Sequence, residues 1–151
     1  MYSYEYDMET FENGSDSVVA SFNMSLNIEL KENSKKETVQ SNWTVTTQFL
    51  GIREKDNKIV GMVNIRHELT TDFLKNYAGH IGYGIGKAYR GKGYATEGLR
   101  LTIEKAWDII EEEEIYISVH KDNPASLKVQ QKNGAFIHRE DDKEFYTRIK
   151  R

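Results

Sequence analysis

Apolar and polar residues alternate along much of the chain, and this two-residue period is typical of half-buried β-strands. Residues 44–53 and 59–65 are both rich in β-branched and aromatic side chains, and the polar stretch 54–58 separates them. Two such runs joined by a short polar segment predict an antiparallel hairpin. Nearer the N-terminus, the apolar residues of 18–30 fit a strand or a ragged helix equally, and residues 29–41 are expected to form a solvated loop or an exposed helix end.

A further strand is expected over 80–85, after a short helix or turn over 69–77 that ends at Gly79. Its two faces differ in kind, because Ile81, Tyr83 and Ile85 share one face whereas Gly82, Gly84 and Gly86 share the other. Glycines weaken a strand, so three of them on one face predict that something packs or binds close to this backbone.

The period then changes to that of a helix over 93–110, where apolar residues recur every three or four positions. This stripe consists of Ala95, Leu99, Ile103, Ala106 and Ile110. After an acidic turn over 111–114, residues 115–120 are expected to form a buried strand.

A second helix is predicted after this strand, with Asn123 as its N-cap and Pro124 at its first helical position. Asn133 and Gly134 are expected to end it. Two more strands follow over 135–139 and 145–149, separated by a polar turn.

A chain of 151 residues is expected to form one domain, residues 1–151. It contains no cysteine, which excludes disulfides, thiolate metal sites and a cysteine nucleophile. The net charge of −3 argues against a general nucleic-acid binder, and the four histidines are too scattered for a metal motif, so no metal is expected. No stretch reads as a signal peptide or a membrane span, so we expect a cytoplasmic protein that does not bind membranes.

The segment that follows the strand over 80–85 carries the clearest chemistry. A glycine-rich loop with three basic residues opens the helix over 93–110, and a helix N-terminus offers unpaired N–H groups and positive potential to an anion. Three phosphate-loop motifs compete here. The nucleotide triphosphatase loop fails because Gly93 stands where a Ser or Thr must reach magnesium, and the dinucleotide fingerprint lacks its third glycine. The pattern Arg-x-x-Gly-x-Ala is met by residues 90–95.

With these residues the chain resembles the GNAT superfamily of N-acetyltransferases over residues 43–150, where hairpin, strand, loop, helix, strand and Asn-x-x-Ser follow in the family's order. The resemblance implies a mixed α/β (α+β) fold, in which a central, twisted, largely antiparallel sheet is flanked by helices. It also implies that acetyl-CoA is the co-substrate and that the loop's backbone N–H groups bind its pyrophosphate. The residues implied in binding are Ile85, Gly86, Lys87, Arg90, Gly91, Lys92, Gly93, Tyr94, Ala95, Asn123 and Ser126.

The chain also departs from the family's pattern. Residues 1–42, the acceptor side in the family, lack the clear strand and two helices that usually open the fold. Many members carry a tyrosine seven residues after the Asn, where it protonates the leaving thiolate, and here Gln130 occupies that position. The tyrosine-acid mechanism is therefore not expected at that position.

Acetyl transfer needs a neutral amine, donors for the oxyanion and a proton for the leaving thiolate. The backbone N–H near Ile85 is the expected oxyanion donor, and Ser126 is the thiolate-side candidate, the alternative being that it only caps its helix. His120 and Glu68 are candidate bases, with His80 as a further residue at a strand end; the alternative is a structural or solvated role for each.

We therefore expect an N-acetyltransferase that moves the acetyl group to a primary amine by direct transfer in a ternary complex. The acceptor is a small molecule or a protein, and the enzyme is a monomer or a homodimer. Two alternatives stay open: a catalytically silent CoA-binding sensor module of the same fold, and a nucleotide phosphotransferase that uses the near-miss loop.

Overall fold

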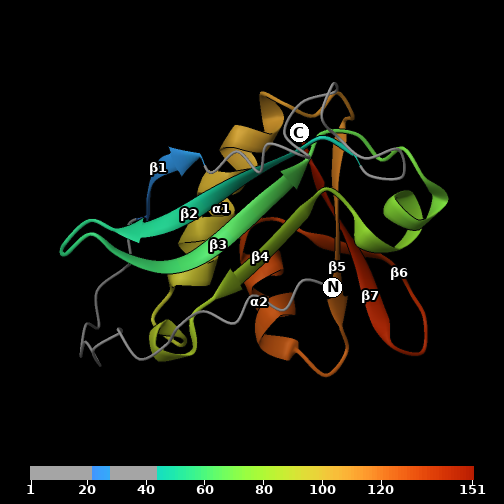
Figure 1. Ribbon diagram of the computed structural model, residues 1–151. Coiled ribbons are helices and arrows are strands. Elements are labelled where there is room, and N and C mark those ends of the chain that lie inside the picture. The colour runs from blue at the N-terminus through green and yellow to red at the C-terminus, as the bar shows by residue number, and fades with distance from the viewer. Residues whose placement is uncertain (1–21, 28–43) are drawn as a thin grey trace.

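The structure, a computed structural model, describes residues 22–27 and 44–151 (Figure 1). Its strands are β1 (Phe22–Asn27), β2 (Thr46–Arg53), β3 (Lys58–Arg66), β4 (Ile81–Ile85), β5 (Glu114–His120), β6 (Phe136–Glu140) and β7 (Glu144–Lys150). Its helices are α1 (Tyr94–Trp107) and α2 (Pro124–Lys132), with a short π-helical turn η2 (Leu74–Ala78) and a 3-10 turn η3 (Lys87–Tyr89).

The strands form two antiparallel sheets, each built from a continuous part of the chain. The first sheet has the order β1-β2-β3-β4, and the second has the order β5-β7-β6. The predicted hairpin is β2 and β3, which pair from Thr46 opposite Arg66 to Arg53 opposite Lys58. The mixed α/β class with antiparallel sheets flanked by helices is confirmed, and the expected central sheet is divided where β4 and β5 separate.

Strands β4 and β5 meet at one end and diverge toward the other. The N–H of His80 donates to the carbonyl of Tyr116 at 2.7 Å, and the N–H of Tyr116 donates to Nδ1 of His80 at 2.9 Å. Gly79 precedes this junction, and a Cβ on Gly79 would lie 2.3 Å from the Tyr116 carbonyl oxygen. Only a glycine therefore allows the two strands to approach this closely, and we call this contact the closed end of β4.

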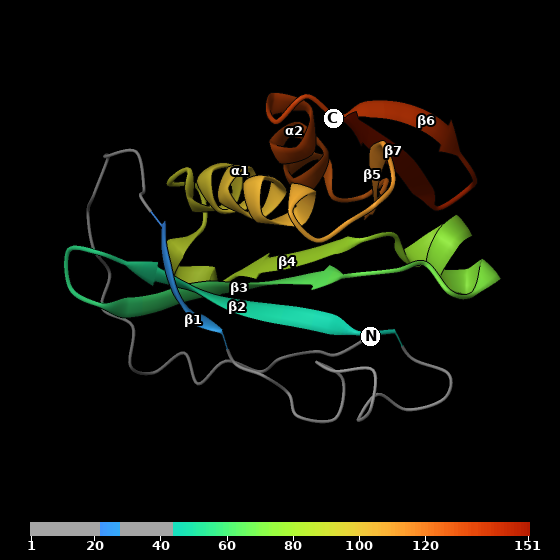
Figure 2. The ribbon, with the colours of Figure 1, turned by 90° about the horizontal axis from the view of Figure 1, so that it is seen from above.

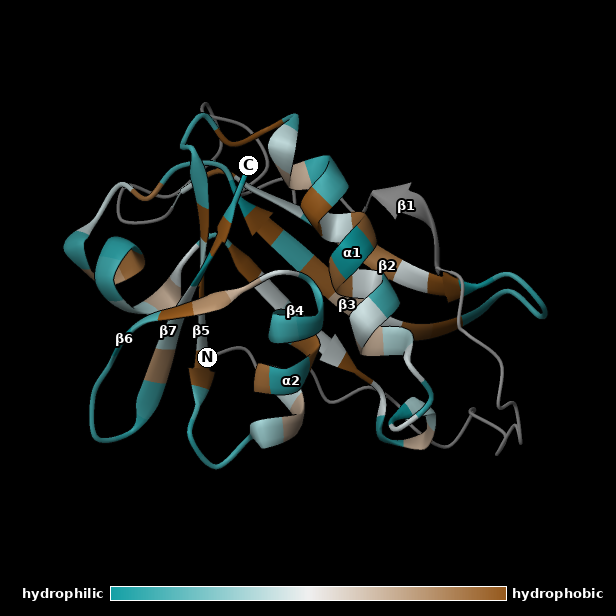
Figure 3. Ribbon diagram, turned by 180° about the vertical axis from the view of Figure 1, so that it is seen from behind, coloured by the Kyte–Doolittle hydropathy of each residue, from teal (hydrophilic) through white to brown (hydrophobic). Residues whose placement is uncertain are grey.

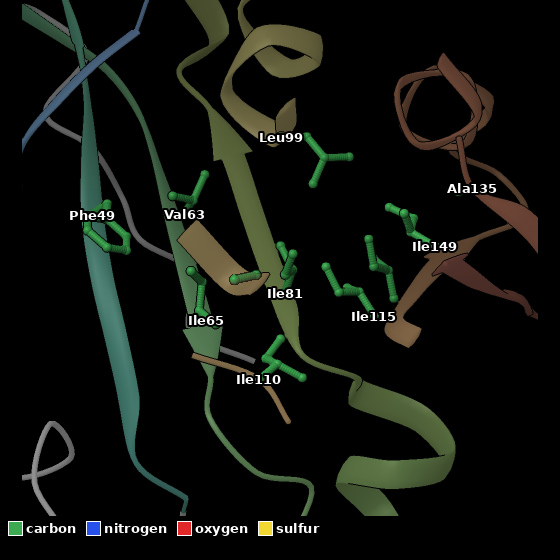
Figure 4. Close-up of a cluster of buried hydrophobic side chains, with 11 residues drawn as sticks. Phe49, Val63, Ile65, Ile81, Leu99, Ile110, Ile115, Ala135 and Ile149 are labelled. Atoms are coloured by element: carbon green, nitrogen blue, oxygen red, sulfur yellow. The ribbon is translucent and has the colours of Figure 1, made fainter. Parts of the chain in front are cut away.

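The hydrophobic core lies between the two sheets and beneath α1. Figure 4 shows Ile81 of β4 beside Ile115 of β5, with Leu99 of α1 above them. The buried residues of this cluster are Phe49, Val63, Ile65, Ile81, Leu99, Ala106, Ile110, Ile115, Ile117, Ala135 and Ile149. The predicted helical stripe is confirmed at Leu99 and Ala106, which are buried, and at Ile103, which packs against them. The helix ends at Trp107 rather than at residue 110, so Ile110 joins the same core from beyond the end of α1.

Both helices and the second sheet lie on the same side of the first sheet (Figure 2). In Figure 3 the apolar positions of β2 and β3 lie beneath α1, while the polar β2–β3 turn projects away from the helices. The N-termini of α1 and α2 lie near the C-terminal ends of β4 and β5, where these two strands have diverged.

The remaining expectations have mixed outcomes. The segment with either strand or helix character contains strand β1, and residues 29–41 lie outside the described residues. The acidic turn is one residue shorter than expected, because Glu114 pairs with Lys150 as the first residue of β5. The caps of α2 are confirmed: Asn123 Oδ1 accepts from the N–H of Ser126, Pro124 opens the helix and Gly134 follows it with φ +87°.

Candidate functional site

The loop between β4 and α1 is shaped by two glycines in the left-handed region. Gly91 has φ +74° and Gly93 has φ +87°, conformations that other residues adopt only with strain. A Cβ built on either glycine would meet no atom of the described residues within 4 Å. The backbone of this loop is therefore uncovered on the side where a side chain would otherwise stand.

Helix α1 begins directly after this loop, with Gly93 as its N-cap. Its first intrahelical bond runs from the N–H of Glu97 to the carbonyl of Gly93 at 3.1 Å. The N–H groups of residues 94–96 have no acceptor inside the helix, because each would need a carbonyl that precedes it. These donors and the positive end of the helix dipole favour an anion beside the loop.

The three basic residues of the loop differ in environment. Lys87 and Arg90 are exposed, whereas Lys92 is half-buried. Arg90 donates through Nε to the carbonyl of Ile85 at 3.0 Å, so its guanidinium folds back over the end of β4. Positive charge is thereby held at the point where the strand enters the loop.

Tyr94 turns its side chain into the protein rather than toward the loop. It is 3% exposed and packs edge-on against Tyr89, in a small buried cluster with Val60. Its hydroxyl accepts from the guanidinium of Arg53 at 3.4 Å. The buried side chain of Tyr94 therefore does not face the loop. The predicted contact of Tyr94 with a ligand would be made by its backbone N–H.

The edge of β4 that faces β5 carries the backbone groups of Tyr83 and Ile85. Arg66 donates to the carbonyl of His80 and Gly86 donates to the carbonyl of Val60, so the hydrogen-bonded pairs with β3 fall on even-numbered residues of β4. In an antiparallel ladder the intervening residues direct their N–H and C=O to the opposite edge. This geometry supports the expected role of the Ile85 N–H as a donor to a bound ligand.

Ser126 lies in the first turn of α2 and contacts β4. Its Oγ is 2.7 Å from the hydroxyl oxygen of Tyr83, and that hydroxyl is 3.3 Å from the Ser126 carbonyl oxygen. The side chain that caps α2 belongs to Asn123. The hydroxyl of Ser126 therefore has a partner outside the helix cap, namely Tyr83.

Gln130 is held inside the fold by buried partners. It is fully buried, and its Oε1 accepts from Oγ1 of Thr147 at 2.6 Å. Its Nε2 is 3.5 Å from the carbonyl oxygen of Ser118. An amide held in this way lacks an acidic proton, which agrees with the sequence-based expectation for this position.

His120 ends β5 and is exposed. Its Nε2 lies 3.4 Å from a carboxylate oxygen of Glu144, the residue opposite it on β7. The N–H of Asn123 donates to the carbonyl of His120 at 2.9 Å, so this histidine adjoins the start of α2. His120 and Asn123 thus lie in one turn between β5 and α2, and Ser126 follows in the first turn of α2.

Glu68 lies elsewhere. With His67, Ile109, Glu111 and Glu112 it lines a separate cavity of about 390 Å³, beyond the C-terminal end of α1. The glycine loop precedes the N-terminal end of the same 14-residue helix, which is about 21 Å long at 1.5 Å per residue. The structure does not bring Glu68 together with Ser126 and the loop.

His80 is fully buried at the closed end of β4. Its Nδ1 accepts from Tyr116, so its Nε2 carries the proton and faces Glu112 at 3.5 Å. Burial lowers the pKa of His80 below its usual value, and the nearby Glu112 acts in the opposite direction. We assign His80 a structural role.

Tyr83 is the site residue that the sequence analysis missed. Alternation placed it on one face of the strand with Ile81 and Ile85, and no role followed from that position. The residue type itself could have pointed to it, because the hydroxyl of a half-buried tyrosine usually has a hydrogen-bond partner. Here that partner is Ser126.

Among the described residues, no group of three or more histidine or acidic side chains could hold a metal ion. No helix of residues 22–27 and 44–151 is long and apolar enough to cross a membrane.

A family model described as an acetyltransferase (GNAT) domain matches residues 4–135. This match takes in most of residues 1–42, which the sequence analysis had set apart from the family's pattern.

Several solved structures share the fold. An acetyltransferase (GNAT family) from Bacillus anthracis is 20% identical with a TM-score of 0.56, over 68% of this chain and 65% of that chain. The Campylobacter jejuni N-acetyltransferase PseH, solved with acetyl coenzyme A, is 22% identical with a TM-score of 0.53, over 70% and 68%. Spermidine N-acetyltransferase from Vibrio cholerae, solved with CoA and spermine, is 16% identical with a TM-score of 0.56, over 70% and 65%. The chain thus spans just under two thirds of the Bacillus and Vibrio proteins.

Proposed function

The chain belongs to the GNAT acetyltransferase family, and from this premise we propose that it is an N-acetyltransferase that uses acetyl-CoA. It moves the acetyl group to a primary amine directly, in a ternary complex, and residues 1–151 act as one acetyltransferase domain. The observation that carries the proposal is the continuity of three features: the outward edge of β4, the uncovered glycine loop and the N-terminus of α1.

In this proposal the loop binds the phosphates of the co-substrate. Backbone N–H groups of residues 91–95 supply donors, and Lys87, Arg90 and Lys92 supply positive charge. The backbone of Ile85 holds the pantetheine and polarises the thioester carbonyl, so that much of the rate comes from positioning and from a fixed donor. Asn123 contacts the same ligand from the start of α2.

The acceptor must be neutral to attack, although a free alkyl ammonium group has a pKa of about 10.4. His120 is the base that we propose, because it is exposed and adjoins Asn123 and Ser126. Ser126 is the proposed donor to the leaving thiolate. We assign no step to Glu68, which lies beyond the other end of α1.

The glycine loop offers a sharp test with a matched control. Gly93 and Gly134 both have φ +87°, and a Cβ on either would meet no atom within 4 Å. Gly93→Leu and Gly134→Leu should therefore each destabilise the fold by about 1–2 kcal/mol through the same backbone strain. We expect that only Gly93→Leu abolishes the thermal stabilisation by acetyl-CoA, which amounts to about 2.7 kcal/mol at a hundred times the Kd.

The ligands compared are acetyl-CoA, CoA, and ATP with magnesium. Stabilisation of the wild-type protein by ATP with magnesium alone, or by none of the three, would overturn the proposal. If acetyl-CoA binds, a panel of amines that includes polyamines, amino sugars and peptide N-termini is assayed for release of the CoA thiol.

Burial of Gln130 favours a second function, a CoA-binding sensor module that does not turn over. In that case the loop variants behave as described above, but no amine in the panel releases CoA. Release with any amine at a rate above that of hydrolysis excludes this alternative.

A further inference from the structure

We propose that Tyr83 is a positioning residue of the thiolate side, holding the hydroxyl of Ser126 and resupplying the proton that Ser126 gives up. This inference rests on the proposed acetyl transfer and deepens it. It assigns a role to a residue of β4, although neither the loop motif nor the Asn-x-x-Ser motif contains it.

The first support is the contact itself. Tyr83 lies in the middle of β4, and its half-buried ring packs against the main core cluster. Its hydroxyl reaches both Oγ and the carbonyl oxygen of Ser126, at 2.7 and 3.3 Å, from 43 positions earlier in the chain. This pair therefore fixes the first turn of α2 against the strand whose outward edge is the proposed binding edge.

The second support is that the helix cap does not need the Ser126 hydroxyl. Asn123 Oδ1 accepts from the backbone N–H of Ser126 at 3.1 Å, which caps α2 without Oγ. A serine hydroxyl has one proton to donate and two lone pairs to accept. When Tyr83 donates to one lone pair, the serine proton is directed elsewhere and becomes a better donor, because linked hydrogen bonds polarise one another.

The third support comes from Gln130. Its amide is fully buried and engaged with Thr147, so α2 supplies no acid at that position. Tyr83 brings a phenol to the same helix from the opposing strand. Burial raises the pKa of Tyr83 above its usual value, whereas its hydrogen bonds with Ser126 and Gln130 lower it, so the proton donated to Ser126 comes from a neutral phenol.

The proton balance closes without a further reactant. The amine nitrogen forms a bond to the acetyl carbon and the C–S bond breaks. Sulfur keeps the electron pair and takes the proton of Ser126 Oγ–H, and Oγ takes the phenolic proton of Tyr83. The proton that the acylated nitrogen releases passes to His120 and reaches the tyrosinate through solvent. One proton leaves nitrogen and one reaches sulfur, so the protein returns to its starting state.

The test compares Tyr83→Phe with Tyr146→Phe. Each variant loses one hydroxyl from a tyrosine packed in the fold, and the Tyr146 hydroxyl bonds to Asp141 at 2.6 Å instead of to Ser126. Two quantities are measured: the Kd of CoA, by calorimetry, and the pKa of the bound CoA thiol, from the pH dependence of its alkylation by iodoacetamide. Neither measurement requires a known acceptor.

We expect the wild-type protein and Tyr146→Phe to lower the pKa of the bound thiol by at least one unit relative to free CoA. Tyr83→Phe should return it toward the free value while the Kd changes less than threefold. Ser126→Ala, which keeps the Asn123 cap, should do the same. Ser126→Thr should retain the low thiol pKa. In the double variant Tyr83→Phe with Ser126→Ala, the thiol pKa should rise no further than in the more affected single variant.

An unchanged thiol pKa in Tyr83→Phe or in Ser126→Ala, with CoA still bound, would overturn this inference and leave the proposed function intact. Failure of the wild-type protein to bind CoA would overturn both. If Tyr83→Phe does not fold, the comparison of Ser126→Ala with Ser126→Thr decides the matter, since a purely structural contact would not move the pKa of a bound thiol.

Discussion

The two ends of β4 use glycine for opposite reasons. At the closed end, a Cβ on Gly79 would lie 2.3 Å from the carbonyl oxygen of Tyr116, so protein atoms already fill the space. Toward the other end, a Cβ on Gly84, Gly91 or Gly93 would meet no atom within 4 Å. We call this second region the open end of β4.

Gly84 is the most telling of these residues. Unlike Gly91 and Gly93, it has no positive φ that would favour glycine. Within residues 22–27 and 44–151, neither backbone conformation nor packing therefore requires a glycine there, and a side chain would fit. The three-glycine face predicted that something packs or binds close to this backbone. At Gly82 it is the Asn64 side chain, 3.0 Å from a built Cβ, whereas at Gly84 the approach of a ligand stays a prediction.

The largest expected effect separates the two ends by stability. Gly79→Ala forces a Cβ against Tyr116 at φ +71°, which combines overpacking with backbone strain. It should lower the free energy of unfolding by about 3 kcal/mol or more, measured by urea denaturation. Gly84→Ala in the adjoining strand should change it by less than about 1 kcal/mol. Equal losses in the two variants would remove the distinction between the ends.

The next effect distinguishes the two ends of β4 by the binding of CoA. Gly84→Leu places a side chain on the uncovered part of β4 and should weaken CoA binding at least thirtyfold, about 2 kcal/mol. The free energy of unfolding should stay within about 1 kcal/mol of that of the wild-type protein. Calorimetric titration measures the affinity, and wild-type affinity in this variant would show that the ligand does not approach Gly84.

The closed end should also respond to pH. Burial lowers the pKa of His80, against the influence of Glu112 and together with that of Arg148 and Arg66. Below about pH 6.5 the unfolded chain binds a proton that the folded protein resists, so stability is complete above that pH and falls as the pH decreases. The loss cannot exceed about 1.4 kcal/mol per pH unit for one proton.

The variant His80→Gln keeps an acceptor for the N–H of Tyr116 and removes this titration. Its free energy of unfolding should therefore depend less on pH between 6.5 and 5 than that of the wild-type protein. If the free energy of unfolding falls equally steeply with decreasing pH in both proteins, groups other than His80 cause the pH dependence.

The smallest effect concerns charge at the open end. Lys87 is exposed beside the loop, and Lys105 is exposed in the last turn of α1. Lys87→Gln should weaken CoA binding about threefold at low ionic strength and less in high salt, since exposed charges are screened. Lys105→Gln, at the far end of the same helix, should leave the affinity unchanged, and equal effects would indicate a general charge effect.

Local signals made the loop and the helix caps predictable. Asn123 and Pro124 act within a few residues of each other, and the left-handed glycines shape the segment that contains them. The pairing of Tyr83 with Ser126 joins residues 43 positions apart, and no local pattern encodes it.

Strand ends were less informative about the site. Glu68 follows one apolar run and His80 precedes the next, which suggested that both residues border the acceptor site. The structure buries His80 between Tyr116 and Glu112, and it places Glu68 in a separate cavity. The division into two sheets was also hidden, because whether β4 and β5 pair along their length depends on packing around Gly79.

Each sheet comes from one uninterrupted stretch of the chain, and this has a consequence for folding. The pairings of β5, β6 and β7 all lie within residues 114–150, and those of β2, β3 and β4 within residues 46–85. Sheets that pair only within their own stretch of chain favour separate cooperative units. The segment of residues 111–113 between α1 and β5 is thus the natural place to cut the chain into two fragments that reassemble, with amide exchange at Tyr116 reporting when they have docked.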